Sequence, residues 1–596
     1  MNSHLVNHLL TLFAKGELPA TQVQSILYFA RKDGWGPAGD RLGSKLASAG
    51  SEGLHKSNIH RDIISRCRAA GLMSSGAMPY DVKLPDNTSV QMFLPHEIFH
   101  HMAAKEGLPN LCLPAEELHA NTGPGALLRS WAEHRDVNFT GDLKDVAMLG
   151  LHCDGVPYTN SVRAGGGKSI FVCSLNCFSA AAESVKRKRH TLFTLQKARL
   201  CDCGCSGFHT LELLFSILVW SLRCLALGLS PASRHDDTPW TAADDKGRLP
   251  SSATIPRAAM LQVRGDWEFF ETAFRFRSVN SDAFCWKCQA TKSPGPFCAW
   301  DFRPEAPHRS TSISHVAYMA SCLATGSGVP ALFRSPGFVI DYVAIDSMHA
   351  GDLGVFQDAT GSLFWLFCYN QQWNRNRMVG LASLHKLIAE HYKAHSEKNH
   401  SRVFPTMAQI KSKKTPKYPY LKAKAAETRH LAEFCMVLAR LMRFGGPGIA
   451  PLKFRLSHPM AGKEEQILQS LTLCFDNMAF YHRSCAAEPF VAVDCKTTMY
   501  RFLQGFASLH TIWRVGRPEA ECAAAPWHLR PKAHVLQHLV EDQLRLWGSP
   551  SRSWCYRDED FVGAVKRIAA RSMHPSTLEA RLTEKLCLLS GLSSGV

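Results

Sequence analysis

The chain has 596 residues, of which 45% are hydrophobic and 20% charged, so it is too apolar for a disordered protein and long enough for several domains. Its 68 Lys and Arg residues against 51 Asp and Glu residues give a net charge of +17, which favours a polyanionic partner, nucleic acid before a membrane surface. Its 21 cysteines are too sparse for a disulfide scaffold, and we expect no secretory signal at the N-terminus. We therefore expect reduced cysteines, so clustered ones are candidate metal ligands.

The first 140 residues predict an accessory helical region. Apolar residues recur at helical spacing over 5–14 and 21–31, and 94–106 has the pattern of a further helix. The sequence of this region shows no zinc finger and no basic recognition helix.

The next part of the chain predicts an α/β domain. Four apolar runs rich in β-formers predict strands at 146–152, 169–175, 191–196 and 258–263. Residues 208–229 are apolar over a length that could cross a bilayer, but Glu212 and Arg223 favour a buried core helix over a membrane span. Strand, strand, strand, helix, strand is the order expected of an RNase H-like domain with a mixed sheet.

The remainder is mostly helical in pattern. The strongest predicted helices cover 378–393, 425–443, 463–482 and 497–515. Residues 553–556 predict a short strand, which leads into a helix with Asp558 as its N-cap. A last helix and a polar tail follow.

Three acidic residues stand at the ends or starts of these elements. Asp154 and Asp266 each come after a strand-like run, beside a glycine, and Glu559 opens the helix that follows 553–556. Two-metal phosphoryl transfer needs carboxylates on a rigid scaffold that holds ions about 3.5–4 Å apart, and Mg²⁺ prefers such oxygen ligands. The three residues are therefore a candidate catalytic site, although an isolated Asp-Gly pair is most often a turn.

Short motifs in a fixed order accompany these acids. They are HCDGVPY (152–158), RGDWEFF (264–270) followed by CWKC (285–288), IDSMH (345–349), RPKAHVLQHLVED (530–542) and CYRDEDFVGAVKRI (555–568). Their order and spacing resemble the landmarks of cut-and-paste DDE-type DNA transposases, the CACTA, Plavaka and Kyakuja-Dileera-Zisupton group in particular. The resemblance covers roughly residues 146–570.

This resemblance implies an α/β fold with an RNase H-like mixed sheet, which a large all-helical insertion interrupts, and an N-terminal helical region. The long separation of Asp266 from Glu559 fits such an insertion. The expected organisation is an N-terminal helical region (1–140), the first part of the core with its CxxC (141–300), the helical insertion (301–530), the last part of the core (531–572) and a C-terminal tail (573–596).

Carried over residue by residue, the resemblance implies that Asp154, Asp266 and Glu559 bind catalytic Mg²⁺ or Mn²⁺. The ions would activate water or a 3′-hydroxyl for DNA cleavage and strand transfer. Asp558 and Asp560 flank Glu559 and stay open as alternatives for the third acid.

Two further pairs are candidate support or ligand residues. Asp346 and His349 match the family's Asp-x-Met-His motif and are an i, i+3 pair. The pair either organises the insertion, touches the site, or is simply a capped helix with a buried histidine. His534 and His538 are an i, i+4 pair that could share a ligand, but HVLQH lacks the Glu of a zinc-protease HExxH motif, so we exclude that class.

Two cysteine and histidine clusters are candidate structural zinc sites. The first combines the CxxC with two downstream residues and consists of Cys285, Cys288, Cys298 and His308. The second lies just before the apolar helix, where glycines permit a turn that gathers its members, Cys201, Cys203, Cys205 and His209. A reduced, glycine-rich loop is the alternative interpretation of the second cluster.

Two basic runs are candidate DNA contacts, although a run of charges is more often a solvated face. The candidate residues are Lys186, Arg187, Lys188, Arg189, Lys411, Lys413, Lys414 and Lys417. Tyr418 and Tyr420 could stack on bases, and VKRKRH also has the composition of a nuclear targeting signal.

The sequence thus predicts a nuclear, transposon-related protein with DNA as its partner, no membrane association, and a homo-oligomeric active form. The principal hypothesis is metal-dependent DNA cleavage and strand transfer. The alternative is a catalytically inactive descendant that binds zinc and DNA, because no N-terminal DNA-binding module is evident and the third acid is ambiguous. An unrelated cysteine-rich α/β scaffold is the third hypothesis.

Overall fold

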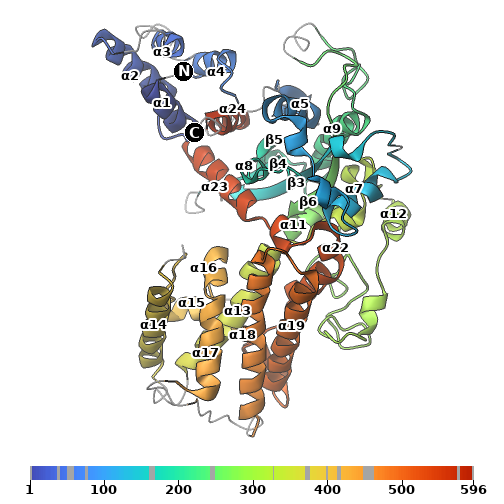
Figure 1. The fold of residues 1–596 in the computed structure, drawn as a ribbon, viewed down its shortest axis with the longest axis vertical. Helices are drawn as coiled ribbons and strands as arrows, with labels where there is room; N and C mark the ends of the chain where they lie inside the picture. Colours follow the sequence, from blue (N-terminus) through green and yellow to red (C-terminus); the bar gives the residue numbers. More distant parts are fainter. Residues whose placement is uncertain are drawn as a thin grey trace. The chain divides into compact units, whose positions relative to one another are not determined.

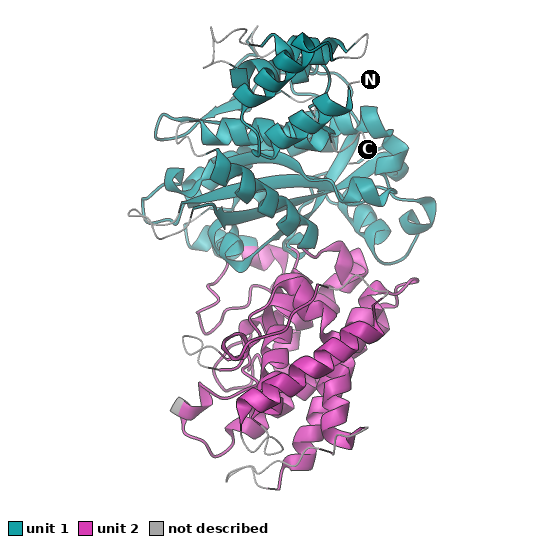
Figure 2. Ribbon diagram, turned by 90° about the vertical axis from the view of Figure 1, so that its left-hand side faces the viewer, with its two compact units in different colours: residues 1–275, 319–343, 556–596 teal, residues 276–318, 344–555 magenta. Residues whose placement is uncertain are grey.

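The structure is a computed structural model and describes residues 3–592 except 36–39, 50–58, 74–77, 138, 160–167, 242–247, 327, 370–375, 397–400, 412–417, 447–450, 452–461 and 573–576. Two compact units make up the chain (Figure 2). Unit 1 contains residues 1–275, 319–343 and 556–596, and unit 2 contains residues 276–318 and 344–555. Each unit is thus built from segments that are separated in sequence.

Unit 1 is built on one mixed sheet of six strands, so the chain has an α/β fold. The strands are β1 (Tyr80–Lys83), β2 (Ser89–Met92), β3 (Val146–Pro157), β4 (Ser169–Cys177), β5 (His190–Gln196) and β6 (Arg257–Gly265), in the spatial order β1-β2-β5-β4-β3-β6. β3 and β6 are parallel, and the other neighbours are antiparallel.

The four long strands coincide with the predicted ones, whereas β1 and β2 lie in the region that was expected to be wholly helical. Almost every residue of β4, β5 and β6 is buried, because helices cover both faces of the sheet. This two-sided burial is why these strands appear in the sequence as continuous apolar runs rather than as alternating ones. β1 and β2 have only four residues each and extend the sheet at its edge.

The two faces of the sheet have different cores. On one face, Phe171 and Phe193 contact the rings of Phe269 in α11 (Trp267–Phe274) and Phe215 in α9 (Phe208–Leu227), respectively. On the other face, the strand residues Val156, Ile170 and Val172 pack against α23 (Tyr556–Arg571) and α24 (Leu578–Leu592). Figure 1 shows both pairs of helices around the sheet.

α9 is the predicted apolar helix, and among the described residues it is the one helix whose length and composition would allow it to cross a membrane. Most of its apolar window, 61%, is buried inside the protein, where it packs against β6 and against α5 (Pro95–Glu106). This burial matches the expected core helix.

The N-terminal helices form a separate cluster within unit 1. They are α1 (His4–Ala14), α2 (Ala20–Lys32), α3 (Arg41–Ala47) and α4 (Ile59–Ala69), and their shared core includes Leu588 of α24. The C-terminal segment is therefore a packed helix of unit 1 up to Leu592. Three short helices complete the parts around the sheet: α6 (Ala115–Leu118), α7 (Pro124–Ala132) and α8 (Glu183–Lys186).

Unit 2 is helical throughout its described residues, apart from loops. Its helices are α13 (Phe356–Cys368), α14 (Arg377–Ala394), α15 (Met407–Ile410), α16 (Ala425–His430), α17 (Ala432–Phe444), α18 (Glu464–Ala486), α19 (Ala492–Arg514), α20 (Glu519–Cys522), α21 (Pro531–His538) and α22 (Leu544–Trp547). α12 (His315–Ala324) contains the boundary between the units. α18 and α19 approach closely at Gly505, where an added Cβ would lie 3.0 Å from the backbone nitrogen of Cys474.

The predicted strand at 553–556 is wrong. Trp554 and Cys555 lie in a loop, and α23 begins at Tyr556. The backbone N–H of Cys555 donates to the Asp346 carboxylate at 2.9 Å, so a side chain takes the bond that a neighbouring strand would have accepted. The other large helical predictions of this region correspond to α14, α16 with α17, α18 and α19.

Candidate active site and metal centre

Asp154 and Asp266 are neighbours where the parallel pairing of β3 with β6 ends; Asp154 lies inside β3, which continues to Pro157, and Asp266 follows the last residue of β6. Cys153 of β3 is in register with Gly265 of β6, so the residue that follows each one is an aspartate. Adjacent strands are about 4.8 Å apart, which sets the separation of the two backbones. The two aspartates are thus neighbours on the sheet, although the strand that was predicted to end at His152 continues through Asp154 to Pro157.

Both aspartates belong to the face of the sheet that α23 covers. Asp154 pairs directly with Val172 of β4, and Val172 packs against Val562 and Val565 of α23. Directly paired residues of neighbouring strands share a face. Arg264 lies two residues before Asp266 and bonds to Asp558 of α23, so the alternation along the strand carries Asp266 to the same face.

Each aspartate also has a local structural role. Oδ1 of Asp266 accepts the N–H of Phe269 at 2.7 Å and caps α11, while Oδ1 of Asp154 accepts the N–H of Gly155 at 2.6 Å. Each of these bonds uses one carboxylate oxygen. Both side chains are half-buried, which leaves them less enclosed than the strand residues before them.

The first turn of α23 is attached to the sheet by a buried ion cluster. Asp558 is fully buried and accepts hydrogen bonds from Arg189, at the start of β5, and from Arg264, whose Nη2 lies 3.1 Å from Oδ1. Burial opposes ionisation of Asp558, but the two guanidinium groups outweigh it and hold the pKa of the carboxyl well below its usual range.

The three neighbouring acids Asp558, Glu559 and Asp560 differ in their contacts and burial. Asp558 is committed to two arginines, and Asp560 is exposed and 3.6 Å from Arg557. Glu559 is half-buried and follows directly after the residue that is attached to the sheet. Of the three acids, Glu559 is thus the one that is neither part of the buried arginine cluster nor exposed.

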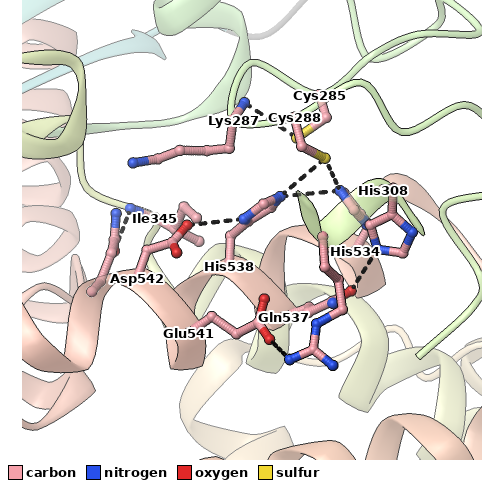
Figure 3. A network of polar contacts seen from close by, with 12 residues as sticks. Cys285, Lys287, Cys288, His308, Ile345, His534, Gln537, His538, Glu541 and Asp542 are labelled. Carbon is pink, nitrogen blue, oxygen red and sulfur yellow. Dashed lines mark hydrogen bonds and ion pairs between the residues drawn. The ribbon is translucent and has the colours of Figure 1, made fainter. Parts of the chain in front are cut away.

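A second site lies in unit 2, where two cysteines and two histidines converge from distant parts of the chain (Figure 3). They are Cys285, Cys288, His534 and His538, all buried, with one donor atom from each lying within 4.8 Å of the others. Nε2 of His534 lies 3.2 Å from the Cys288 sulfur and 3.2 Å from Nε2 of His538. Two thiols and two imidazoles are the donor set of a closed, tetrahedral structural zinc site.

The surroundings of this centre suit a cation. Nδ1 of His538 lies 2.9 Å from the Asp542 carboxylate, which orients the ring so that Nε2 faces the sulfurs (Figure 3). Burial disfavours the thiolate of Cys285, yet the hydrogen bond from Cys288 and the charge of His538 hold its pKa well below the ordinary value. Burial likewise disfavours the charged His538, yet the Cys285 thiolate and Asp542 raise its pKa to about 10.

The structure replaces half of the ligand set that the sequence predicts here. Cys298 and His308 are not members of the converging group. His308 is buried next to it, with its ring 5.0 Å from that of His534 and its Nε2 3.3 Å from the Gln537 side chain. Cys298 and His308 were predicted because they are close to the CxxC in sequence. In the structure, the i, i+4 histidine pair of α21 takes their place. The spacing of the two histidines in HVLQH was the signal in the sequence that could have indicated this pair.

Asp346 and His349 are brought together, with Cys555 as a third neighbour whose donor atom lies within 4.8 Å of theirs. Asp346 is buried, and its oxygens accept from the N–H groups of Met348, His349 and Cys555 at 2.9–3.1 Å and lie 2.6 Å from Nδ1 of His349. Burial raises its pKa, but these bonds, the His349 bond first, outweigh burial and lower it. Asp346 thus accepts the first N–H groups of the helix that starts at Met348 and ties them to the loop at Cys555, while His349 is half-buried.

The first basic run is largely engaged in structural contacts. Arg189 is buried against Asp558, Lys188 lies 3.0 Å from Glu106, and Arg187 pairs with Glu183 one turn earlier. The prediction that Arg189 contacts DNA is therefore wrong, because a side chain clamped inside the protein cannot reach a phosphate. Lys186 has a half-buried side chain at the end of α8.

The second basic run is described only in part. Lys413, Lys414 and Lys417 lie outside the described residues. The ammonium group of Lys411 lies 5.2 Å from the Trp365 ring centre. Tyr418 is buried and stacks on His528 at 4.3 Å, so its ring is not available to a base, contrary to the prediction.

Cys201, Cys203, Cys205 and His209 also converge, as the glycines between them predict. The three groups named here are the only ones, within the part of the chain that the structure describes, in which at least three such side chains bring donor atoms within 4.8 Å of one another. Asp154, Asp266 and Glu559 do not form a group this tight. No protein-family model matches the chain, and no curated protein matches it.

Proposed function

We propose that unit 1 is an RNase H-like catalytic core and that the protein is a transposase-like or transposon-derived enzyme for metal-dependent DNA cleavage and strand transfer. One observation carries this proposal. Asp154, inside β3, and Asp266, directly after β6, are neighbours across this parallel pair on the face under α23, and Glu559 follows the residue that attaches α23 to those strands. Acids at these positions give a rigid scaffold for a pair of divalent ions.

The order of the strands supports the proposed core. β3, β4 and β5 form a consecutive antiparallel meander, and β6 joins the opposite edge of β3 in parallel after the α9 crossover. Three strands, a helix and a fourth strand in this sequence order are expected of an RNase H-like domain, which supports the proposed core, with β1 and β2 as additions. Unit 2 lies between β6 and α23 in the chain and fits the proposed helical insertion.

The chemistry follows from the three carboxylates. A pair of Mg²⁺ or Mn²⁺ ions bound there would activate water or a 3′-hydroxyl and stabilise the charge that develops on the phosphate. Asp154 and Asp266 would supply oxygen ligands from the sheet, and Glu559 would supply one from the helix. The buried Asp558 cluster would hold the helix in place while a negatively charged strand approaches.

We further propose that the buried Cys285, Cys288, His534 and His538 centre binds a structural zinc ion. All four coordination positions come from the protein, which leaves none open for a substrate. Since the two cysteines and the two histidines lie at opposite ends of unit 2 in sequence, such an ion would join the two ends of the unit.

A nicking assay with the full-length protein tests the proposed activity. Supercoiled plasmid is incubated with the protein and Mn²⁺ or Mg²⁺, and the open-circular product is quantified. We expect metal-dependent nicking that Asp154→Asn and Glu559→Gln each reduce at least 100-fold. The matched control is Glu268→Gln, which removes an exposed carboxylate two residues after Asp266 and leaves the three acids intact.

Metal binding separates the principal hypothesis from the alternative. Mn²⁺ binding, measured by electron paramagnetic resonance, should weaken in Asp154→Asn but not in Glu268→Gln. DNA binding without nicking, in a protein that binds no Mn²⁺ at Asp154, would support the catalytically inactive descendant. Nicking that persists unchanged in both active-site variants would refute the proposed site.

A further inference from the structure

A cluster of zinc-type ligands lies on the surface of unit 1, at the start of α9. Cys201 and Cys205 bring their sulfurs to 3.1 Å, and Nδ1 of His209 lies 3.2 Å from the sulfur of Cys203. One donor atom from each of the four lies within 4.8 Å of all the others. The donors of a tetrahedral zinc ion, with bonds of about 2.0–2.3 Å, lie at similar separations from one another.

The backbone of this loop explains how alternate cysteines come to face one point. In an extended strand, Cys201, Cys203 and Cys205 would all lie on one face but would be spread along it. Here Gly204 and Gly207 have φ of 85° and 88°, values that glycine adopts without strain. The chain therefore curls around the cluster, and His209 projects from the first turn of α9.

The neighbouring packing holds the loop in this form. A Cβ on Gly207 would lie 2.9 Å from the Leu200 side chain, so the glycine allows the close approach of the two ends of the loop. The N–H of Cys201 donates to the hydroxyl of Thr210 in α9 at 3.0 Å. The loop is thus attached to the helix at both ends, independently of the thiols.

A disulfide is a less complete explanation of this geometry. It would join Cys201 to Cys205, but it would not explain why Cys203 and His209 also converge on the same point. A metal ion uses all four donors, and a set rich in thiolates selects zinc over Mg²⁺ or Ca²⁺. Cys203 and His209 are exposed and the other two are half-buried, in contrast to the buried centre of unit 2.

We propose that the three cysteines and His209 bind one Zn²⁺ ion in a solvent-accessible Cys₃His site, which fixes the loop to the first turn of α9. This site is separate from the buried centre and does not depend on the proposed DNA cleavage. Its exposure makes the ion exchangeable, whereas an ion in the buried centre is shielded from chelators.

Zinc counting on the full-length protein tests the proposal. The protein is purified in reducing buffer, equilibrated with Zn²⁺ alone, and its bound zinc is measured by mass spectrometry. We expect the Cys203→Ser/Cys205→Ser variant to hold one equivalent less than the unmodified protein. Cys522→Ser, which removes a half-buried thiol outside both clusters, should hold the same amount as the unmodified protein.

Two further measurements guard against simple misfolding of the loop. His209→Cys, which keeps four zinc ligands, should retain the equivalent that His209→Ala loses. A chelator should remove one equivalent from the unmodified protein in a fast phase, at least tenfold faster than any other zinc, and this phase should be missing in the double variant. Because only the difference between variants is counted, the state of the buried centre does not affect the outcome.

Either of two results would overturn the proposal. The first is an equal zinc content in the unmodified protein and the double variant, when both show the same circular dichroism spectrum. The second is a Cys201–Cys205 disulfide, found by peptide mapping of protein that was alkylated in the presence of Zn²⁺.

Discussion

The substitution Asp558→Asn tests how α23 is attached to the sheet. The carboxylate of Asp558 accepts three hydrogen bonds from Arg189 and Arg264 in a fully buried position. An amide of the same shape keeps one acceptor oxygen, turns the other into a donor, and leaves two guanidinium groups without a counter-charge. Removing one partner from a buried ion cluster costs about 3–5 kcal/mol, so we expect a loss of that size in the stability of this region.

Hydrogen exchange is the appropriate assay, because a chain with two compact units need not unfold in one transition. Amides of peptides from 556–571 should exchange on the order of 100- to 4,000-fold faster in Asp558→Asn, since 1.4 kcal/mol corresponds to a factor of ten. Asp560→Asn is the matched control. Asp560 is exposed and 3.6 Å from its partner, so its loss should change the stability by about 0.5 kcal/mol or less.

The pH dependence supplies a second check. The folded-state pKa of Asp558 lies below the usual value of an aspartate, about 3.9, so its stabilising effect is complete above that value. The effect is lost as the pH falls below about 4 towards the lowered folded-state pKa, and the two proteins should converge there. Equal exchange in Asp558→Asn and Asp560→Asn at pH 7 would show that the cluster does not hold α23.

Three further substitutions have sharp expectations. Burial, with Arg581 second, lowers the pKa of Lys585 to about 8, so its charged form destabilises the fold below that pH. Lys585→Met should therefore raise the local stability at pH 7 by about 2 kcal/mol after the loss of its Ser572 bond, measured by hydrogen exchange of peptides from 578–592. The gain should fade between pH 8 and about 10.5 and be absent for the exposed Lys566→Met. Cys285→Ser should remove one zinc equivalent and lower the melting temperature of unit 2, measured by calorimetry; an unchanged zinc content would contradict the buried centre. Gly361→Ala places a Cβ 2.2 Å from the carbonyl carbon of Tyr420 and should cost about 1–3 kcal/mol or more, measured by hydrogen exchange of peptides around the substituted residue. Gly295→Ala, with open space around it, should stay within about 0.5 kcal/mol in the same assay.

The parts of the fold that the sequence predicted are those in which local pattern and tertiary burial agree. β3 to β6 and α9 are buried on most sides, so their apolar runs are continuous and easily recognised. β1 and β2 escaped recognition because four residues with polar members carry too little periodicity. Residues 553–556 were predicted to be a strand because they are apolar. In the structure this apolar composition serves the packing of a loop.

For the candidate sites, too, the sequence predicted local features and missed residues that come together from distant parts of the chain. Asp154 and Asp266 could be proposed as one site because each follows an apolar, strand-like run, but the sequence did not show that β3 continues through Asp154 to Pro157. The partners of the CxxC are nearly 250 residues away, and a helical i, i+4 pair gives no indication of what it faces. Arg189 looked like a solvated cation in a basic run, and only the fold reveals that a carboxylate of the last helices neutralises it.

The interrupted make-up of unit 1 has a consequence for how the protein is made. During synthesis the sheet and α9 leave the ribosome early, but α23 and α24 emerge only after all of unit 2. Until then Arg189 and Arg264 have no counter-charge, and the apolar face of Ile170 and Val172 has no cover. An incomplete chain that ends within unit 2 therefore has an uncovered apolar sheet face, which only the last two helices of the protein can bury.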